Sequence, residues 1–295
     1  MKNISKKIAN LCFFVSDLHG QIPRYQSLFG AIRSEQPAAV FLGGDLLPYA
    51  WISSNAEGTP NQSFVLNYLE ANFNQLHFEL GESYPCVFLI LGNDDPRSAE
   101  MEVLSGDSSG VWKYLSERRA TFDEFTVYGY PFVPPTPFLL KDWERYDVSR
   151  FVDTGCISPE EGWRTIPTRS NQVQHATIQK DLELLTAGHD LTNTIFLFHS
   201  PPYNTDLDLL AAMGKTYDHV PLDTHAGSIA IRRFIENRQP LLSLHGHIHE
   251  SALLSGAWKC QIGRTVCYSA AHHGPELALV RFDPHHPQEA TRQII

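Results

Sequence analysis

The chain has 295 residues, of which 42% are hydrophobic and 19% charged, with 19 Gly and 19 Pro. This length and composition predict one large α/β unit with a sizeable core, and they exclude a disordered tail and a collagen-like fibre. A net charge of -10 argues against a broad polyanion-binding surface and disfavours nucleic acid as a partner.

Apolar runs that end in polar or glycine residues alternate with helical periodicities. The predicted strands are 11–15, 38–42, 86–91, 125–128, 194–198 and 241–244. The predicted helices are 24–36, 64–80, 178–185 and 229–235. Continuous apolar runs suit strands buried on both faces, and their alternation with helices predicts a sheet that is at least partly parallel.

The segment from 130 to 169 fits neither pattern, because prolines at 131, 134, 135 and 137 forbid a regular helix or central strand at its start. We expect an ordered excursion over the surface, which is either a binding loop or a packing insert. The predicted organisation is therefore a single domain over residues 1–295 with a Pro-rich insertion at about 130–170.

The pattern changes after Ser251 to short alternating segments at 258–262, 265–269 and 277–282, which predict an antiparallel meander. Gly263 and Arg264 suit a tight hairpin turn that would place Cys260 opposite Cys267 in a hydrogen-bonded pair. That register disfavours a disulfide, so we expect free thiols.

Targeting signals are not apparent in the sequence. The apolar run at 11–15 is too short for a signal peptide, and no run approaches the ~20 residues that span a bilayer. An odd number of cysteines, five, fits a reducing compartment. These features predict a cytoplasmic protein without membrane contact, whereas the oligomeric state stays open.

Polar side chains follow five of the predicted strands at the point where each strand ends. The residues are Asp17 and His19, then Asp45, then Asn93 with Asp94 and Asp95, then His199, and finally His247 and His249. Ligands of open α/β sheets bind at the carboxyl ends of strands, so these groups are expected to meet at one rim. Oxygen and imidazole ligands without thiolate suit Mn, Fe, Zn, Co or Ni.

Such a rim suits phosphoester chemistry. An Asp carboxylate can bridge two ions, and two ions about 3.5–4 Å apart can hold both the attacking and the leaving oxygen of an in-line displacement at phosphorus. A water bound to such ions becomes hydroxide near neutral pH. Glycines beside several of these residues allow the backbone to turn tightly and to approach the ions.

In these five blocks the chain resembles the calcineurin-like metallophosphoesterases. The blocks read Asp17-Leu18-His19, Gly44-Asp45, Gly92-Asn93-Asp94-Asp95, His199 and Gly246-His247-Ile248-His249. The resemblance implies an α/β fold, a four-layer sandwich of two mixed β-sheets flanked by helices. It also implies two divalent transition-metal ions, one held by Asp17, His19 and His249, the other by Asn93, His199 and His247, with Asp45 as the bridge.

The implied function is a dinuclear metal-dependent phosphoester hydrolase that uses a metal-bridging hydroxide on a small phosphoester, with monoester and diester hydrolysis both open. Asp94 and His199 are the residues assigned to catalysis. Asp94 replaces a family histidine that contacts the scissile phosphate and assists the leaving group. An ionised Asp94 would repel phosphate, so it either keeps a proton or points elsewhere.

Other readings stay open for the function and for several side chains. The alternative function is a catalytically weak scaffold or binding module on the same fold, and a nuclease would need a basic groove that the charge balance does not suggest. Arg97 could neutralise substrate phosphate or form a surface ion pair. We interpret His245 as a hydrogen-bonded core histidine, and His272 and His273 as exposed turn residues that could still approach the rim.

Overall fold

The computed structural model describes residues 10–49, 63–211, 216–217, 220–221 and 224–295. Its first sheet has the strand order β14-β13-β1-β2-β3-β4. The central strands β1 (Cys12–Val15), β2 (Ala39–Gly43) and β3 (Cys86–Ile90) run parallel, as does the short β4 (Lys113–Tyr114). Strands β13 (Ala278–Phe282) and β14 (Thr291–Ile294) are antiparallel additions at one edge.

The second sheet has the order β11-β12-β10-β7-β6-β5. Its parallel centre consists of β6 (Phe125–Tyr130), β7 (Thr194–Phe198), β10 (Leu242–His245) and β12 (Thr265–Ser269). The edges β5 (Arg118–Phe122) and β11 (Lys259–Ile262) are antiparallel. A separate small ribbon pairs β8 (Thr216–Tyr217) with β9 (Val220–Pro221).

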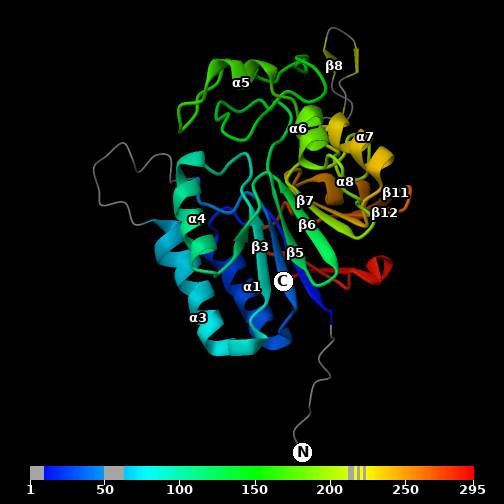
Figure 1. The fold of residues 1–295 in the computed structure, drawn as a ribbon. Coiled ribbons are helices and arrows are strands. Elements are labelled where there is room, and N and C mark those ends of the chain that lie inside the picture. The colour runs from blue at the N-terminus through cyan, green and yellow to red at the C-terminus, as the bar shows by residue number, and fades with distance from the viewer. Residues whose placement is uncertain (1–9, 50–62, 212–215, 218–219, 222–223) are drawn as a thin grey trace, which may run out of the picture.

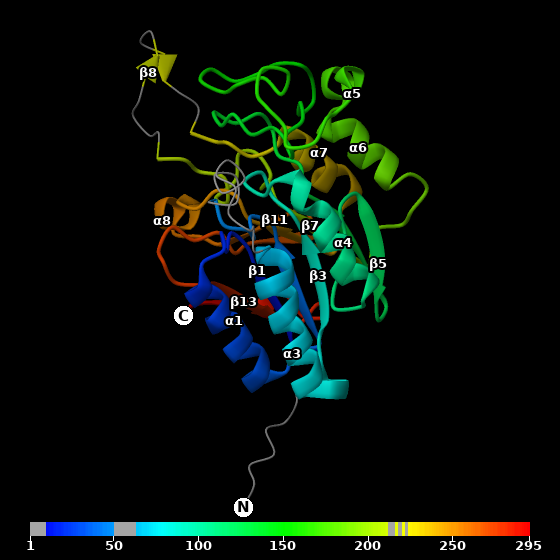
Figure 2. The same ribbon diagram turned by 90° about the vertical axis from the view of Figure 1, so that its left-hand side faces the viewer.

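The two sheets pack face to face between two helical layers. Helices α1 (Ile22–Glu35), α3 (Ala71–Leu80) and α4 (Glu100–Ser108) lie against the first sheet (Figures 1 and 2), and a π-helical segment, Val65–Glu70, leads into α3. Helices α6 (Ile178–Leu185) and α7 (Ile229–Arg238) lie beside the second sheet. The architecture is the expected four-layer α/β sandwich.

Alternation along the strands explains the layers, because successive side chains point to opposite faces of a sheet. Phe14 and Phe41 belong to the core between the sheets, whereas Phe13 belongs to the core under the helices. On the second sheet, Phe196 and Phe198 contact Phe234 of α7. Strands buried on both faces read as continuous apolar runs, which is why the sequence locates them well.

The antiparallel meander expected after Ser251 is wrong. Residues Ser251–Ser255 form the short helix α8, and β11 and β12 make a hairpin. Strand β13 crosses to the first sheet, where it pairs antiparallel with β1 and β14. Within that hairpin Cys260 lies opposite Cys267 and both are free thiols, as expected. Hairpin pairing is local, whereas the sheet that accepts β13 depends on β1, which lies far away in sequence.

Residues 131–169 run over the upper end of the molecule without regular helix or strand, and helix α5 (Ser170–His175) follows them (Figure 1). This segment, called the excursion below, has its own buried anchors. Trp143 is fully buried and packs against Phe132, and the buried side chains of Lys141 and Glu144 form an ion pair. Asp147 accepts the backbone N–H of Ile229 at 2.7 Å and so fixes the excursion to the start of α7.

Candidate metal centre

The carboxyl ends of β1, β2, β3, β7 and β10 meet at one rim between the two sheets. The loops are joined by backbone hydrogen bonds: Asp17 N–H donates to Gly44 at 3.0 Å, and His19 N–H donates to Asp45 at 2.8 Å. Within the second sheet, Gly246 N–H donates to the His199 carbonyl at 2.9 Å, and across the sheets His247 N–H donates to Asp17 Oδ1 at 3.0 Å. All seven predicted ligands are therefore brought into one connected cluster.

Asp17, His19 and His249 form the first group, whose candidate ligand atoms all lie within 4.8 Å of one another. Nε2 of His249 is 3.3 Å from Asp17 Oδ1 and 3.2 Å from Nε2 of His19. Burial opposes ionisation of Asp17, but the hydrogen bond with His249 and the nearby histidines outweigh it and lower the pKa of this carboxyl. The group is thus organised around a carboxylate that stays ionised.

Asp45, His199 and His247 form the second group within the same 4.8 Å limit. Nε2 of His199 is 3.2 Å from Asp45 Oδ2 and 3.0 Å from Asn93 Oδ1. Burial lowers the pKa of His199, but the Asp45 carboxylate more than reverses this, so the pKa is raised. Asp45 is close to His19 as well, since these two and Asp94 make a third group.

The backbone at this rim is unusual. Among the described non-glycine residues, four of those with positive φ are predicted ligands: Asp17 (58°), His19 (47°), Asp45 (53°) and His247 (73°). The left-handed region is costly for residues with a Cβ and concentrates at functional sites. Here it turns the chain sharply just after β1, β2 and β10.

Glycine is required where the loops approach the ligands. A Cβ on Gly92 would lie 2.3 Å from Asp45 Oδ1 and 2.7 Å from the His199 ring. A Cβ on Gly246 would lie 2.7 Å from Asp17 Oδ2. Neither distance can be accommodated without shifting a ligand, so these glycines keep both groups compact.

The donor set fits bound cations. The Gly43 carbonyl can only accept, so Nδ1 of His199, 2.8 Å away, donates to it. When the ring is neutral, as a metal ligand must be, the lone pair of Nε2 faces the oxygens of Asp45 and Asn93. In His19, Nδ1 is buried and has no hydrogen-bond partner among the described residues. Converging acceptor atoms and an orphaned ring nitrogen are typical of a site built to hold cations.

Asp94 faces the cluster. Its carboxylate accepts a hydrogen bond from the Tyr49 hydroxyl at 2.6 Å and from Asn93 Nδ2 at 3.0 Å, and it lies 3.9 Å from His19 Nδ1. Burial, followed by the charge of Asp45, raises the pKa of Asp94 to about 7. Asp94 therefore does not point away from the cluster, and the direction of its pKa shift is the one that favours a retained proton.

Three supporting residues escaped the sequence analysis or were given no role there. Tyr49 stacks on His19 with ring centroids 4.9 Å apart. Asp95 accepts backbone N–H groups from Leu46, Leu47 and Gly92, which ties together the loops after β2 and β3. Arg24 is buried in α1 and donates to the Asp17 carbonyl. A buried arginine in a helix has no distinctive local pattern, so only the fold could reveal it.

Of three further histidines interpreted from the sequence, His245 and His273 are as expected, whereas His272 is half-buried. His245 is fully buried and bonded to Ser243 and to the Ser200 carbonyl, as expected of a core histidine. His272 is 3.3 Å from Glu276, and His273 is exposed. Neither belongs to a group of candidate ligands among the described residues, and the geometry adds nothing to the suggestion that they serve the rim.

The family model for calcineurin-like phosphoesterases matches residues 12–251, which is most of the chain and includes every predicted ligand. The chain belongs to this family. No curated protein matches this calcineurin-like phosphoesterase. Within the described residues, none of its helices is long and apolar enough to cross a membrane.

Two solved structures resemble this calcineurin-like phosphoesterase over nearly their whole length. The protein TT1561 of Thermus thermophilus has a TM-score of 0.58 at 16% identity, over 97% of this chain and 98% of that chain. A dimetal phosphatase from Danio rerio has a TM-score of 0.52 at 11% identity, over 97% and 95%. At these identities the likeness concerns the fold.

Proposed function

We propose that this phosphoesterase is a dinuclear metal-dependent hydrolase of small phosphoesters. The observation that carries the proposal is the pair of ligand groups joined through Asp45, which fits two cations side by side. The Danio rerio protein of similar fold, named a dimetal phosphatase, agrees with it. Asp17, His19 and His249 would hold one ion, Asn93, His199 and His247 the other, with Asp45 between them.

When bound, two such ions activate water and neutralise charge at phosphorus. The side chains of the protein orient one another around that centre and transfer protons there. Asn93 donates to Asp94 and so aims its own oxygen at His199, while Tyr49 holds the Asp94 carboxyl in place. As the phosphorus–oxygen bond to the leaving group breaks, Asp94 in its protonated form gives its proton to the departing oxygen.

The proposal is tested by metal content and turnover of the same preparation. After Mn saturation and removal of excess ions, we expect close to two ions per chain, hydrolysis of members of a phosphomonoester and phosphodiester panel, and loss of both properties in Asp45→Ala. Glu82→Ala, at an exposed carboxylate, is the matched control.

Unchanged metal content in Asp45→Ala would refute the site. Two bound ions without turnover on any ester would instead favour the scaffold or binding module.

A further inference from the structure

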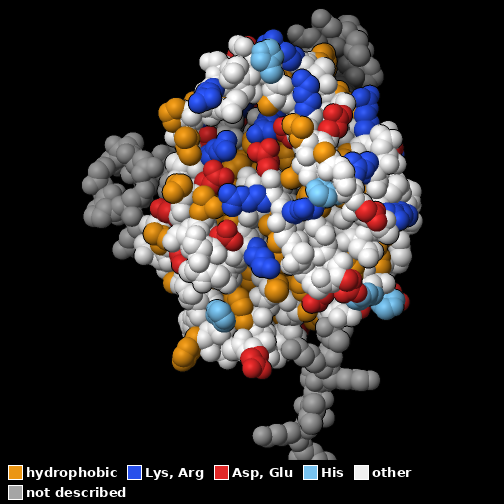
Figure 3. Space-filling view, viewed as in Figure 1, with side chains coloured by type: hydrophobic (Ala, Val, Ile, Leu, Met, Phe, Trp, Pro, Cys, Tyr) orange, Lys and Arg blue, Asp and Glu red, His pale blue; other side chains and the backbone are white. Residues whose placement is uncertain are grey.

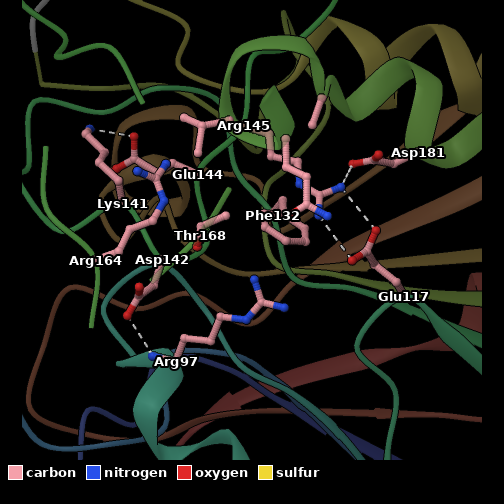
Figure 4. Close-up of a pocket in the computed structure, with 13 residues that line it drawn as sticks. Arg97, Glu117, Phe132, Lys141, Asp142, Glu144, Arg145, Arg164, Thr168 and Asp181 are labelled. Carbon is pink, nitrogen blue, oxygen red and sulfur yellow. Dashed lines mark hydrogen bonds and ion pairs between the residues drawn. The ribbon is translucent and has the colours of Figure 1, made fainter. Parts of the chain in front are cut away.

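A polar pocket lies between the excursion, helix α6 and Arg97 in the turn that follows the Asn93 loop. Its volume is about 340 Å³, within the ~300–1,000 Å³ typical of small-molecule sites. Figure 4 shows Arg97 reaching into its middle, with Arg164 and Arg145 on opposite sides. Figure 3 shows Lys and Arg side chains gathered on the upper half of this face of the molecule.

The acidic groups of the pocket are engaged by donors of the protein itself. Asp142 accepts the backbone N–H groups of Arg97 at 2.7 Å and Thr165 at 3.0 Å. Glu144 is paired with Lys141 at 2.6 Å, and both side chains are fully buried. These carboxylates shape the excursion. Glu144 is paired with a cation, whereas the backbone groups that donate to Asp142 are uncharged.

Arg145 forms one wall of the pocket, and its guanidinium is already bound by groups of the protein. Its guanidinium binds Glu117 at 3.1 and 3.2 Å, binds Asp181 as well, and lies 3.6 Å from the centroid of the Phe132 ring. Figure 4 shows its nitrogens turned toward these two carboxylates at the edge of the pocket. Arg145 is therefore a fixed structural element.

Two guanidinium groups keep unused donors. Arg97 uses only Nε, 3.2 Å from Glu100, and its guanidinium lies 5.0 Å from the Trp143 ring centroid. Half-buried Arg164 makes no hydrogen bond or ion pair with any residue in the described part of the chain. Burial lowers its pKa, and the nearby charges of Asp142 and Glu144 only partly offset this. Partial burial of a guanidinium without hydrogen-bond partners costs folding free energy. An oxyanion that accepts two parallel hydrogen bonds would supply those partners.

We propose that this pocket binds a second oxyanion group of the substrate, a phosphate or a carboxylate, through Arg97 and Arg164. The inference rests on the proposed function and names its substrate class: small phosphoesters with a second negative group. Arg97 follows Asp94 by three residues, so their Cα atoms are at most about 11 Å apart, a span that one small molecule can bridge. The net charge of -10 favours a small ligand over a polyanion.

The test compares Mn-loaded full-length protein with its Arg164→Met variant on two ester series. One series contains alkanediols of three to six carbons with a phosphate at one end, and the other has a phosphate at both ends. We expect wild type to show a lower KM for the bisphosphates. Arg164→Met should raise that KM roughly 10- to 100-fold, the effect of losing a charge-assisted bidentate contact, while kcat and KM for the monophosphates stay unchanged.

A binding measurement separates this inference from the proposed function. Isothermal titration with hexane-1,6-bisphosphonate, which cannot be hydrolysed, should show the same loss of affinity in Arg164→Met. The matched control is Arg169→Met, an exposed arginine that does not line the pocket and should behave as wild type.

Three outcomes are decisive. Turnover of the monophosphates without any preference for bisphosphates overturns the inference and leaves the function intact. Titrated inorganic phosphate that binds through Arg164, again without that preference, identifies a free-anion site and overturns the substrate assignment. Absence of turnover on every ester refutes the function, while the bisphosphonate titration still decides whether Arg164 binds oxyanions.

Discussion

Replacing Lys141 by Met should destabilise the excursion in a pH-dependent way. Lys141 Nζ lies 2.6 Å from Glu144 Oε2, and both side chains are 0% exposed. Methionine keeps the apolar stem but removes the ammonium group, which leaves Glu144 buried with only the donors of Thr136. An uncompensated buried charge costs about 3–5 kcal/mol, so we expect the free energy of unfolding to fall by that amount at pH 8.

The pH dependence follows from the pKa of Glu144, which burial raises from 4.5 to about 7 even though Lys141 lowers it. A carboxyl that binds its proton more tightly in the folded state loses stability as pH rises between the unfolded and folded pKa values. Between these two pKa values the free energy of unfolding of the parent protein falls by roughly 3 kcal/mol as the pH rises. Removal of Lys141 raises the folded pKa further, so the deficit of Lys141→Met should be larger at pH 8 than at pH 5, by at most about 1.4 kcal/mol, the value of the one pH unit between the parent pKa and pH 8.

Urea unfolding followed by circular dichroism at both pH values, with the same Mn excess throughout, measures these effects. Glu144→Gln should also destabilise, because it leaves the Lys141 ammonium without its counter-charge. The double variant should recover at least half of either loss, since two neutral groups replace the pair. A Lys141→Met effect below about 1 kcal/mol at pH 8, or equal at both pH values, would refute the reasoning.

Further predictions concern the metal centre and one capping contact. Replacing His199 or His247 by Ala should lower metal content and activity while circular dichroism stays close to the parent, and full activity in both variants would contradict the second ion site. Tyr49→Phe keeps the stacking but removes the hydrogen bond to Asp94, so rates on alkyl phosphates should fall more than rates on nitrophenyl esters; an equal fall on both would remove Asp94 from leaving-group protonation. Asp147→Ala should cost about 2–3 kcal/mol in urea unfolding, because it removes a buried cap of α7, and a change below about 0.5 kcal/mol would show that the cap is dispensable.

The sequence located the parallel strands and placed the seven candidate ligands at one rim, because buried strands and the polar residues that follow them leave a strong local pattern. Edge strands such as β5 and β14 were missed, since they carry charged and exposed residues without a clear alternation. Helix α4 was missed for a similar reason: it buries only Val103 and Gly106 and shows no apolar stripe.

Local sequence patterns do not indicate contacts between residues that are far apart in the sequence. The bond from Tyr49 to Asp94 and the carbonyls bound by Arg24 at Asp17 and Gly274 depend on how distant loops meet. The same holds for the pocket under the excursion, where Arg97 could be read equally well as a surface arginine until Trp143 and Arg164 were placed beside it. Side-chain roles of this kind are set by tertiary packing.

The position of β1 has a consequence for synthesis in the cell. Phe13 pairs with Val40 on one side and with Arg281 on the other, so β1 acquires its second neighbour only when β13, which is translated much later, has emerged from the ribosome. At about 5–20 residues per second, roughly 10–60 s pass in between. During that time the edge of an entirely apolar strand is open to other chains, which makes this protein a candidate for chaperone protection during translation.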